Sequence, residues 1–245
     1  MHLFADISSH GFGHFAISAP VLVAMAEMCP NLQLTVRSGL PLAKLRERIP
    51  LPFQHIATSS DFGFRMLDAT RVDLAASFAD YRAAHANWRE RVAAEADLLR
   101  SLRVDRVLSN VSYLPLAGAA QAGIPAMAIC SLNWADLFAH LFAGEPGAAD
   151  IHAQILAAYR SAKAFMRITP GMPMPDLGNL REVGVISVPG QRRDLGLGHD
   201  KAVLLAMGGI AHRISLENWP RLPGVRWIVP QAWQCQHPDA VAQES

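Results

Sequence analysis

The chain has little cysteine and no excess of charge of either sign, and each absence argues against a class of protein. It holds three cysteines in 245 residues, with no CxxC pair. This argues against a disulfide framework and a cysteine metal site, and it fits a reducing, cytoplasmic location. The formal net charge is +1 and the charged residues are dispersed, so nothing indicates a nucleic-acid partner.

Long apolar runs are also absent. The most apolar window, residues 115–132, is interrupted by Gly118, Gly123 and Pro125, so it predicts a buried helix, turn and strand rather than a transmembrane segment. The N-terminus lacks the basic region, apolar core and cleavage site of a signal peptide. Because 51% of its residues are hydrophobic, the chain is able to bury a large core, as expected of a soluble protein.

A glycine-rich turn near the N-terminus is the most informative motif. Residues 8–14, SSHGFGH, stand between a short apolar run and an amphipathic segment, an order that predicts strand, turn and helix. Gly11 and Gly13 allow the backbone to turn sharply and to approach a ligand. The first amides of the following helix suit an anionic group. His14, at the start of that helix, is a candidate general base for a bound hydroxyl, although a helix cap or a solvent-exposed side chain is an alternative role.

Strand and helix patterns alternate along the first two thirds of the chain, which predicts an α/β fold with a Rossmann-like parallel sheet and helices on both faces. Besides the first pair, strands are expected at 32–38, 53–57, 105–109 and 126–131, and helices at 42–48, 74–102, 116–122 and 149–165. Ligands of such sheets bind at the carboxyl ends of the strands. The segments expected at that edge are 8–14, 38–39, 58–61, 110–113 and 132–136.

Several polar or aromatic residues of this edge are candidates for binding. Asp61 ends the third strand within an acidic loop, whereas Asp73 is placed to cap the next helix. Trp134 and Asp136 are candidates to line a pocket, with a place in the core as the alternative for the aromatic ring. His10 lies four residues before His14, but in a glycine turn and without a third ligand nearby in the sequence, so no metal site is expected.

The glycine turn is repeated later in the chain. Residues 169–200 are expected to form a linker with an edge strand at 182–188, and a strand at 202–207 then runs into Gly208, Gly209 and Ile210. Because an α/β domain usually needs on the order of 100 residues, we expect a complete N-terminal domain over 1–168 and only the start of a second Rossmann-like domain over 201–245. Its tryptophans, Trp219, Trp227 and Trp233, are expected on an exposed surface that favours self-association.

The order and spacing of these motifs resemble glycosyltransferases of the GT-B architecture over nearly the whole chain. The resemblance is closest to bacterial proteins related to the nucleotide-sugar family that includes MurG, and to the glycosyltransferase-like domain of some sugar kinases. The residues that carry it are Gly11–His14, Asp61–Gly63 with Asp68 and Asp73, Gly123–Pro125, Ser131–Trp134 and Gly208–Ile210.

The resemblance implies an acceptor-binding first domain and a second domain that binds a nucleotide sugar such as a UDP-sugar. It implies that His14 is the catalytic base. Acceptor contacts are expected from Gly11, Phe12, Gly13, Asp61, Asn110, Trp134 and Asp136, and donor contacts from Gly208, Gly209 and Ile210. Backbone amides would stabilise the diphosphate, so neither a metal nor another cofactor is expected. The expected partners are the nucleotide-sugar donor and a small-molecule or lipid-linked acceptor.

Two alternatives remain open. Some relatives orient the base with an aspartate about a hundred positions later, where this chain has Asn110, an amide that bonds an imidazole but brings no charge to the imidazolium. A non-catalytic sugar- or partner-binding module is therefore the first alternative. The second is an NADP-binding Rossmann domain, because Gly11–Ala16 fits the dinucleotide fingerprint and Arg37 is placed to meet a 2′-phosphate. The second glycine turn and the acidic loop argue against it.

Overall fold

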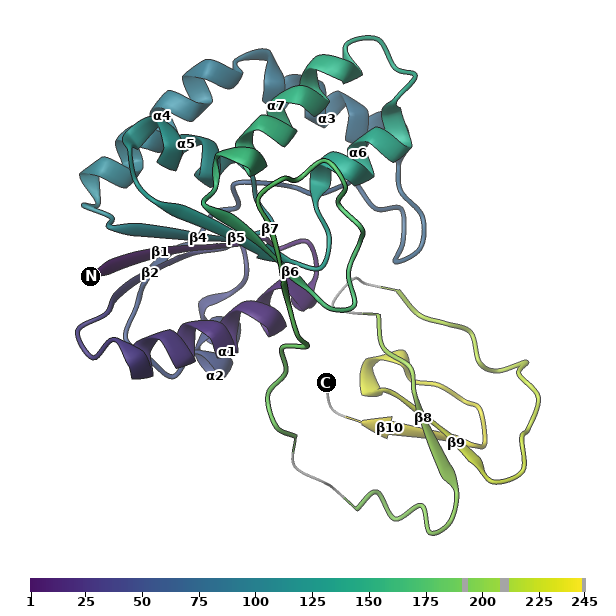
Figure 1. The fold of residues 1–245 in the computed structure, drawn as a ribbon. Helices are drawn as coiled ribbons and strands as arrows, with labels where there is room; N and C mark the ends of the chain where they lie inside the picture. Colours follow the sequence, from purple (N-terminus) through teal and green to yellow (C-terminus); the bar gives the residue numbers. More distant parts are fainter. Residues whose placement is uncertain (191–193, 208–211, 244–245) are drawn as a thin grey trace. The chain divides into compact units, whose positions relative to one another are not determined.

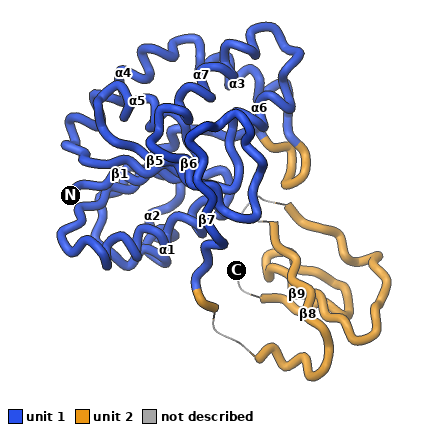
Figure 2. The backbone as a smooth tube through the Cα atoms, viewed as in Figure 1, with its two compact units in different colours: residues 1–65, 72–188 blue, residues 66–71, 189–245 orange. Residues whose placement is uncertain are grey.

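The computed structural model describes residues 1–190, 194–207 and 212–243. The chain divides into two compact units, which are coloured separately in Figure 2. The first comprises residues 1–65 and 72–188, and the second comprises residues 66–71 and 189–245. None of the helices in the described ranges is both long enough and apolar enough to cross a membrane.

The first unit is built on a seven-stranded sheet in which every neighbouring pair of strands is parallel. The strand order is β3-β2-β1-β4-β5-β6-β7. The strands are β1 (His2–Ile7), β2 (Gln33–Arg37), β3 (Gln54–Ile56), β4 (Arg106–Asn110), β5 (Ala126–Cys130), β6 (Ala164–Ile168) and β7 (Leu180–Val183). The chain runs outward from β1 to β3 and then returns to β4 on the other side of β1. Such a reversal creates the crevice at which ligands bind in open α/β sheets.

Helices cover both faces of this sheet, as the sequence predicts (Figure 1). One face carries α1 (Phe12–Met28) and α2 (Leu42–Arg48). The other face carries α3 (Leu74–Ala86), α4 (Trp88–Ser101), α5 (Leu114–Ala122), α6 (Trp134–Phe142) and α7 (Ala148–Ser161). Because the sheet is covered twice, its central strands are apolar on both sides, and the last five residues of β1 are all buried.

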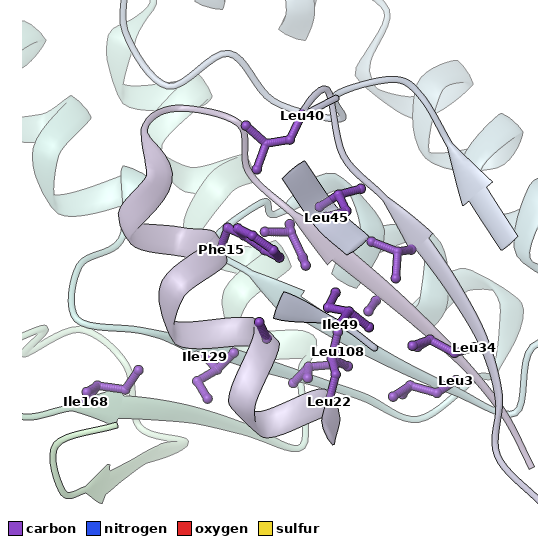
Figure 3. Close-up of a cluster of buried hydrophobic side chains, with 14 residues drawn as sticks. Leu3, Phe15, Leu22, Leu34, Leu40, Leu45, Ile49, Leu108, Ile129 and Ile168 are labelled. Carbon is purple, nitrogen blue, oxygen red and sulfur yellow. The ribbon is translucent and has the colours of Figure 1, made fainter. Parts of the chain in front are cut away.

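The core beneath α1 holds the N-terminal turn in place (Figure 3). Phe15 and Leu22 of α1 are 3% and 0% exposed, and they pack against the apolar side chains of β1, β2 and β4. Burying a side chain of this size contributes about 1.5–3 kcal/mol. The start of α1, which carries His14, is therefore fixed to the sheet by the residues that follow it.

Two predicted helices are shorter than expected. The helix predicted over residues 74–102 is interrupted at Asn87, whose φ of −116° and ψ of 42° lie outside the helical region. Asparagine is a weak helix former because its side chain competes for backbone hydrogen bonds. The helix predicted over residues 149–165 ends at Ser161, and the Lys163 N–H donates to the Ala126 carbonyl, which brings residues 164–168 into the sheet as β6.

The second unit contains a three-stranded parallel sheet in the order β10-β9-β8. Its elements are β8 (Lys201–Leu204), β9 (Val225–Pro230), the 3-10 turn Gln231–Trp233 and β10 (Ala240–Gln243). Trp227 and Trp233 are each 8% exposed and pack with Leu216, so the expectation that they lie on the surface is wrong. Trp219 is 36% exposed. Self-association through this unit stays a prediction.

Candidate functional site

The N-terminal turn places α1 directly after β1. Gly11 has a φ of 92°, a backbone angle that residues other than glycine rarely adopt, and α1 begins at the next residue. Gly13 and His14 therefore lie in the first helical turn. A Cβ atom at Gly13 would meet nothing within 4 Å, so the space beside this turn is open. Gly11, at the N-cap, has no side chain to bond the first amides of α1, so in the described part of the chain these amides are available to a ligand.

His14 is held by Asn110, the last residue of the neighbouring strand β4. The Nδ1 atom of His14 lies 3.0 Å from Oδ1 of Asn110. The Asn110 Nδ2 group donates to the carbonyl oxygen of His14 at 3.0 Å and to Oγ of Ser18 at 2.9 Å, which fixes the orientation of the amide. Because Oδ1 only accepts, Nδ1 of His14 carries the proton and Nε2 presents its lone pair.

The surroundings of His14 keep its ring neutral. Burial of the ring, which is 7% exposed, lowers its pKa. The hydrogen bond that Nδ1–H of His14 donates to Asn110 opposes that shift, and the nearby imidazole of His10 adds to it. Sγ of Cys130 lies 3.7 Å from Nδ1, but burial raises the pKa of this thiol to about 11, so it supplies no negative charge at neutral pH. His14 is therefore an unprotonated base with a defined tautomer at pH 7.

Asp61 and Trp134 form the second part of the site. The Trp134 indole N–H donates to Oδ2 of Asp61 at 2.7 Å, and the indole ring is 5.4 Å from the ring of His10 and 6.0 Å from that of His14. The buried Oδ1 atom of Asp61 has no hydrogen-bond partner among the described residues. Burial raises the pKa of this carboxyl to about 6, and the charge of Asp6 adds to the shift.

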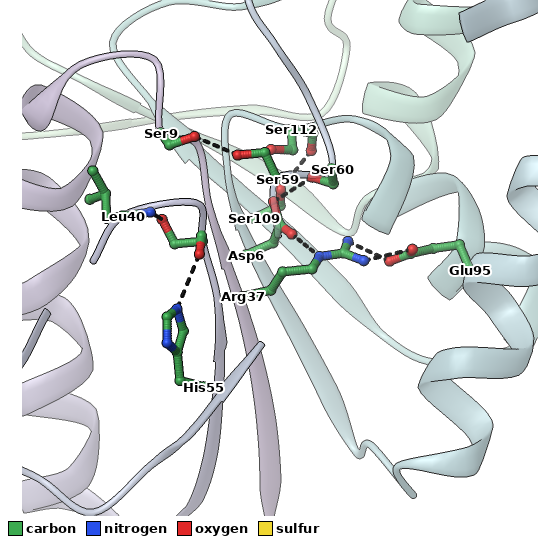
Figure 4. Close-up of polar contacts among 11 residues, drawn as sticks. Asp6, Ser9, Arg37, Leu40, His55, Ser59, Ser60, Glu95, Ser109 and Ser112 are labelled. Atoms are coloured by element: carbon green, nitrogen blue, oxygen red, sulfur yellow. Dashed lines mark hydrogen bonds and ion pairs between the residues drawn. The ribbon is translucent and has the colours of Figure 1, made fainter. Parts of the chain in front are cut away.

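Arg37, at the end of β2, belongs to a buried ion-pair network (Figure 4). Its guanidinium is bonded to both carboxylate oxygens of Glu95, at 2.8 and 2.6 Å, and its Nε atom donates to Asp6. Burial disfavours the charge, but the two carboxylates outweigh that effect and raise the pKa of Arg37. The residue is 5% exposed, so it is not free to bind the 2′-phosphate of NADP, as that alternative requires.

The structure brings four predicted residues into one chain of contacts: His14, Asn110, Trp134 and Asp61. Phe12 is 39% exposed, with the Lys44 ammonium 5.8 Å from its ring centre. Asp136 is half-buried in the first turn of α6. In the described part of the chain, no side-chain hydrogen bond, ion pair or ring–ring contact joins Phe12 or Asp136 to these four. The donor candidates Gly208, Gly209 and Ile210 lie outside the described residues.

The acidic loop before α3 is explained by local structure. Asp73 caps α3 by accepting from the Ala76 N–H at 3.0 Å. Asp68 bonds the backbone and side chain of Thr70 and pairs with Arg71. Sequence reasoning missed Ser18 and Cys130, which both touch the His14–Asn110 pair. Ser18 follows His14 by one helical turn, which is the only signal that points to it. In the described ranges, no three His, Cys, Asp or Glu side chains are grouped to hold a metal ion.

Comparison with known proteins gives one sequence relative and many structural ones. No family model matches the chain. L-arabinokinase of Arabidopsis thaliana is 26% identical over 247 residues, which cover 94% of this chain and 22% of that protein. The chain thus spans about a fifth of the length of the curated relative that it matches.

Solved structures confirm the fold. A kitacinnamycin glycotransferase superimposes with a TM-score of 0.62 at 11% identity, over 100% of this chain and 71% of that one. A UDP-N-acetylglucosamine 2-epimerase gives 0.55 at 12% identity, over 100% and 68%. The spinosyn rhamnosyltransferase SpnG gives 0.51 at 12% identity, over 100% and 71%. The chain therefore has the fold of GT-B glycosyltransferases, as its motifs predict.

Proposed function

We propose that this chain transfers a sugar from a nucleotide-sugar donor to a hydroxyl group of an acceptor, with His14 as the general base. The fold supports glycosyl transfer at the level of the reaction class, because glycosyltransferases are among its structural neighbours. Fold alone does not fix chemistry, and an epimerase shares the architecture. The observation that carries the proposal is the fixed tautomer of His14, whose Nε2 lone pair lies in the first turn of a helix after β1.

In the proposed step, Nε2 of His14 accepts the proton of the acceptor hydroxyl while the oxygen attacks the anomeric carbon of the donor. The bond between that carbon and the diphosphate breaks, and the nucleoside diphosphate leaves with the electron pair. Asn110 holds the ring in position and accepts from Nδ1–H throughout. The uncapped amides at the start of α1 favour the negative charge that develops on the attacking oxygen. Proton removal by a positioned base contributes about 10²–10⁴-fold.

The donor side of the proposal rests on the second unit. Gly208, Gly209 and Ile210 would offer backbone amides to the diphosphate, so the mechanism that we propose uses no metal. A UDP-sugar is the first donor to test, because one structural neighbour is a UDP-N-acetylglucosamine 2-epimerase. A small-molecule or lipid-linked acceptor and a cytoplasmic location complete the proposal.

The test is release of UDP from UDP-sugars by the whole chain, in the presence and absence of mixed sugar acceptors, with products identified by mass spectrometry. His14→Ala should lower the rate by 10²–10⁴-fold while donor binding, measured as UDP-dependent thermal stabilisation, is retained. His140→Ala, an exposed histidine on α6, is the matched control and should leave the rate unchanged. Equal rates for His14→Ala and the parent chain would remove His14 from the mechanism.

The binding-module alternative is favoured by one observation, the amide at Asn110. Because Asn110 brings no charge and the Cys130 thiol is neutral, neither of these two residues supplies a negative charge to stabilise the imidazolium that catalysis would form. UDP-dependent stabilisation with no turnover of any donor would establish this alternative. Turnover that depends on His14 would exclude it.

A further inference from the structure

His10 is the histidine of the glycine turn that the proposed mechanism does not use. Its ring is half-buried and meets the Trp134 indole edge-on at 5.4 Å. The backbone of Gly63 also lies against the ring, so closely that a Cβ atom there would be 2.6 Å from Cγ of His10. The ring is therefore held in place by its neighbours.

Within the described part of the chain, neither ring nitrogen of His10 has a hydrogen-bond partner. The hydrogen bond that His10 makes is donated by its backbone N–H to the side-chain oxygen of Ser8. Burial lowers the pKa of the ring, so it is neutral at pH 7 and carries one donor and one acceptor. His14, whose ring centroid lies 6.0 Å from that of the same indole, also presents a ring nitrogen that Asn110 does not bind. A neutral donor–acceptor pair of this kind matches hydroxyl groups rather than ions.

The charges at this edge of the sheet also disfavour an anionic ligand. Two arginines lie at or next to the last residue of a strand of the first unit, and both are paired: Arg37 with Asp6 and Glu95, and Arg167 with Glu182. Asp6 has a second contact, from the Ser60 hydroxyl at 2.8 Å. Asp61 adds a further carboxyl beside the indole. An acceptor phosphate or carboxylate would thus meet carboxyl groups and no uncommitted guanidinium of β2 or β6. The Lys44 ammonium, 5.8 Å from the centre of the Phe12 ring, is likewise paired, with Glu47 at 3.1 Å.

We propose that His10 and His14 together bind the acceptor through two of its hydroxyl groups, and that the acceptor is an uncharged sugar or polyol. His14 takes the proton of the reacting hydroxyl, and His10 bonds a neighbouring hydroxyl, which fixes which oxygen reacts. This inference rests on the proposed function for the identity of the reacting group. The positive end of α1 then stabilises the negative charge that develops on the attacking oxygen during the reaction. It does not serve to bind an acceptor that is already charged.

The experiment measures how fast diethyl pyrocarbonate modifies the histidines of the whole chain, read by tandem mass spectrometry of the peptides that carry His10, His14 and His140. The reagent attacks accessible neutral imidazole nitrogens, so a bound acceptor slows it. The probes are D-glucose, D-galactose, D-mannose, D-xylose and glycerol, each compared with glucose 6-phosphate and galactose 1-phosphate. At least one neutral probe should protect His10 and His14 together at a lower concentration than either phosphate, while exposed His140 reacts at an unchanged rate.

Three results would overturn the proposal: protection by a phosphorylated probe at equal or lower concentration, protection of His14 alone, or no protection by any neutral probe. The variant His10→Gln keeps hydrogen-bonding capacity and His10→Phe fills the same space without it. His10→Phe should weaken protection of His14 roughly three- to tenfold, and His10→Gln should weaken it less. Equal effects of the two variants would assign His10 a purely structural role.

These outcomes are separate from the test of glycosyl transfer. Protection by neutral sugars without turnover of any nucleotide sugar would leave the subsite in place and remove the proposed reaction. The opposite result is turnover that depends on His14 but uses an acceptor with a phosphate or carboxylate where His10 should bind a hydroxyl. It would support the reaction and rule out this subsite.

Discussion

The Nδ1 atom of His14 lies 3.0 Å from the Oδ1 atom of Asn110, so the hydrogen-bond partner of the candidate base is a neutral amide. An amide fixes the tautomer as well as a carboxylate does, but it brings no charge to the protonated ring. Burial and the nearby His10 both lower the pKa of His14. The hydrogen bond to Asn110 only partly opposes this shift, so the ring stays unprotonated, and no charge on Asn110 stabilises the imidazolium that follows proton transfer.

Replacing the amide by a carboxylate should reverse this balance. In Asn110→Asp, the charge beside Nδ1 should raise the pKa of His14 by on the order of one unit or more. Histidine Cε1–H chemical shifts followed through a pH titration would report it, and the acidic limb of the transfer rate should move to higher pH with it. Ser18→Ala, which removes a contact of the same amide without adding charge, is the control. An unchanged titration in Asn110→Asp would show that the two side chains are not coupled in solution.

Asp61 should make stability depend on pH in an unusual direction. The folded pKa of about 6 lies above the ordinary value of 3.8, so the folded chain binds this proton more tightly than the unfolded chain. Stability is therefore lost as the pH rises from about 4 through 6. Asp61→Asn keeps an acceptor for Trp134 and removes the ionisation, so it should stabilise the chain by on the order of 1–3 kcal/mol at pH 7.5 and by little at pH 4.

Urea unfolding at the two pH values checks this prediction. Asp97→Asn, which changes an exposed carboxylate paired with Arg100, is the matched control and should alter stability by less than about 0.5 kcal/mol at either pH. A stabilisation of Asp61→Asn that is the same at pH 4 and pH 7.5 would contradict the assignment of the raised pKa to this carboxyl.

Part of the site could be predicted because parallel strands end at one edge. The turn after β1 and the end of β4 were both recognisable, and neighbouring strands in a doubly wound sheet bring them together. The geometry predicts a common edge for the two segments, and the resemblance to GT-B glycosyltransferases is what pairs His14 with Asn110, 96 positions apart; the structure shows the hydrogen bond between them. The residue types are read from the sequence itself, which has an amide and no carboxylate at position 110.

The contact between Asp61 and Trp134 could not be predicted in the same way. Asp61 belongs to an irregular loop, whose path no periodicity describes, and the two residues are 73 positions apart. Likewise, the sequence placed Arg37 at the correct edge of the sheet but did not show that Glu95, on a helix, binds its guanidinium. Long-range pairing of side chains depends on packing between elements, which local patterns do not encode.

The ion-pair network around Arg37 should be essential for folding. Arg37→Met leaves the carboxylates of Asp6 and Glu95 buried without a counter-charge, so it should destabilise the chain by about 3–5 kcal/mol. Arg100→Met removes an exposed pair and should cost less than about 1 kcal/mol. Chemical denaturation of the two variants side by side gives the comparison. A loss below about 1 kcal/mol in Arg37→Met would mean that water or a shift of the helix compensates the two carboxylates.

Alanine substitutions at Gly63 and Gly123 form a matched pair that tests how tightly the ring of His10 is packed. Both adopt positive φ, of 58° and 72°, so an alanine at either position carries a similar backbone cost of roughly 1–2 kcal/mol. A Cβ atom at Gly123 meets nothing within 4 Å, whereas at Gly63 it overlaps the ring of His10. Gly63→Ala should therefore destabilise the chain by about 1–3 kcal/mol more than Gly123→Ala, as overpacking typically does.

A double variant isolates the steric part of that difference. If the ring of His10 is the cause, adding His10→Ala should remove the excess cost of Gly63→Ala and leave only the backbone term that Gly123→Ala reports. Gly63→Ala should also change the rate at which diethyl pyrocarbonate modifies His10, because the ring must move. Equal unfolding free energies for the two glycine variants would show that the loop adjusts without a cost in stability, and that Gly63 does not hold the ring of His10 in place in solution.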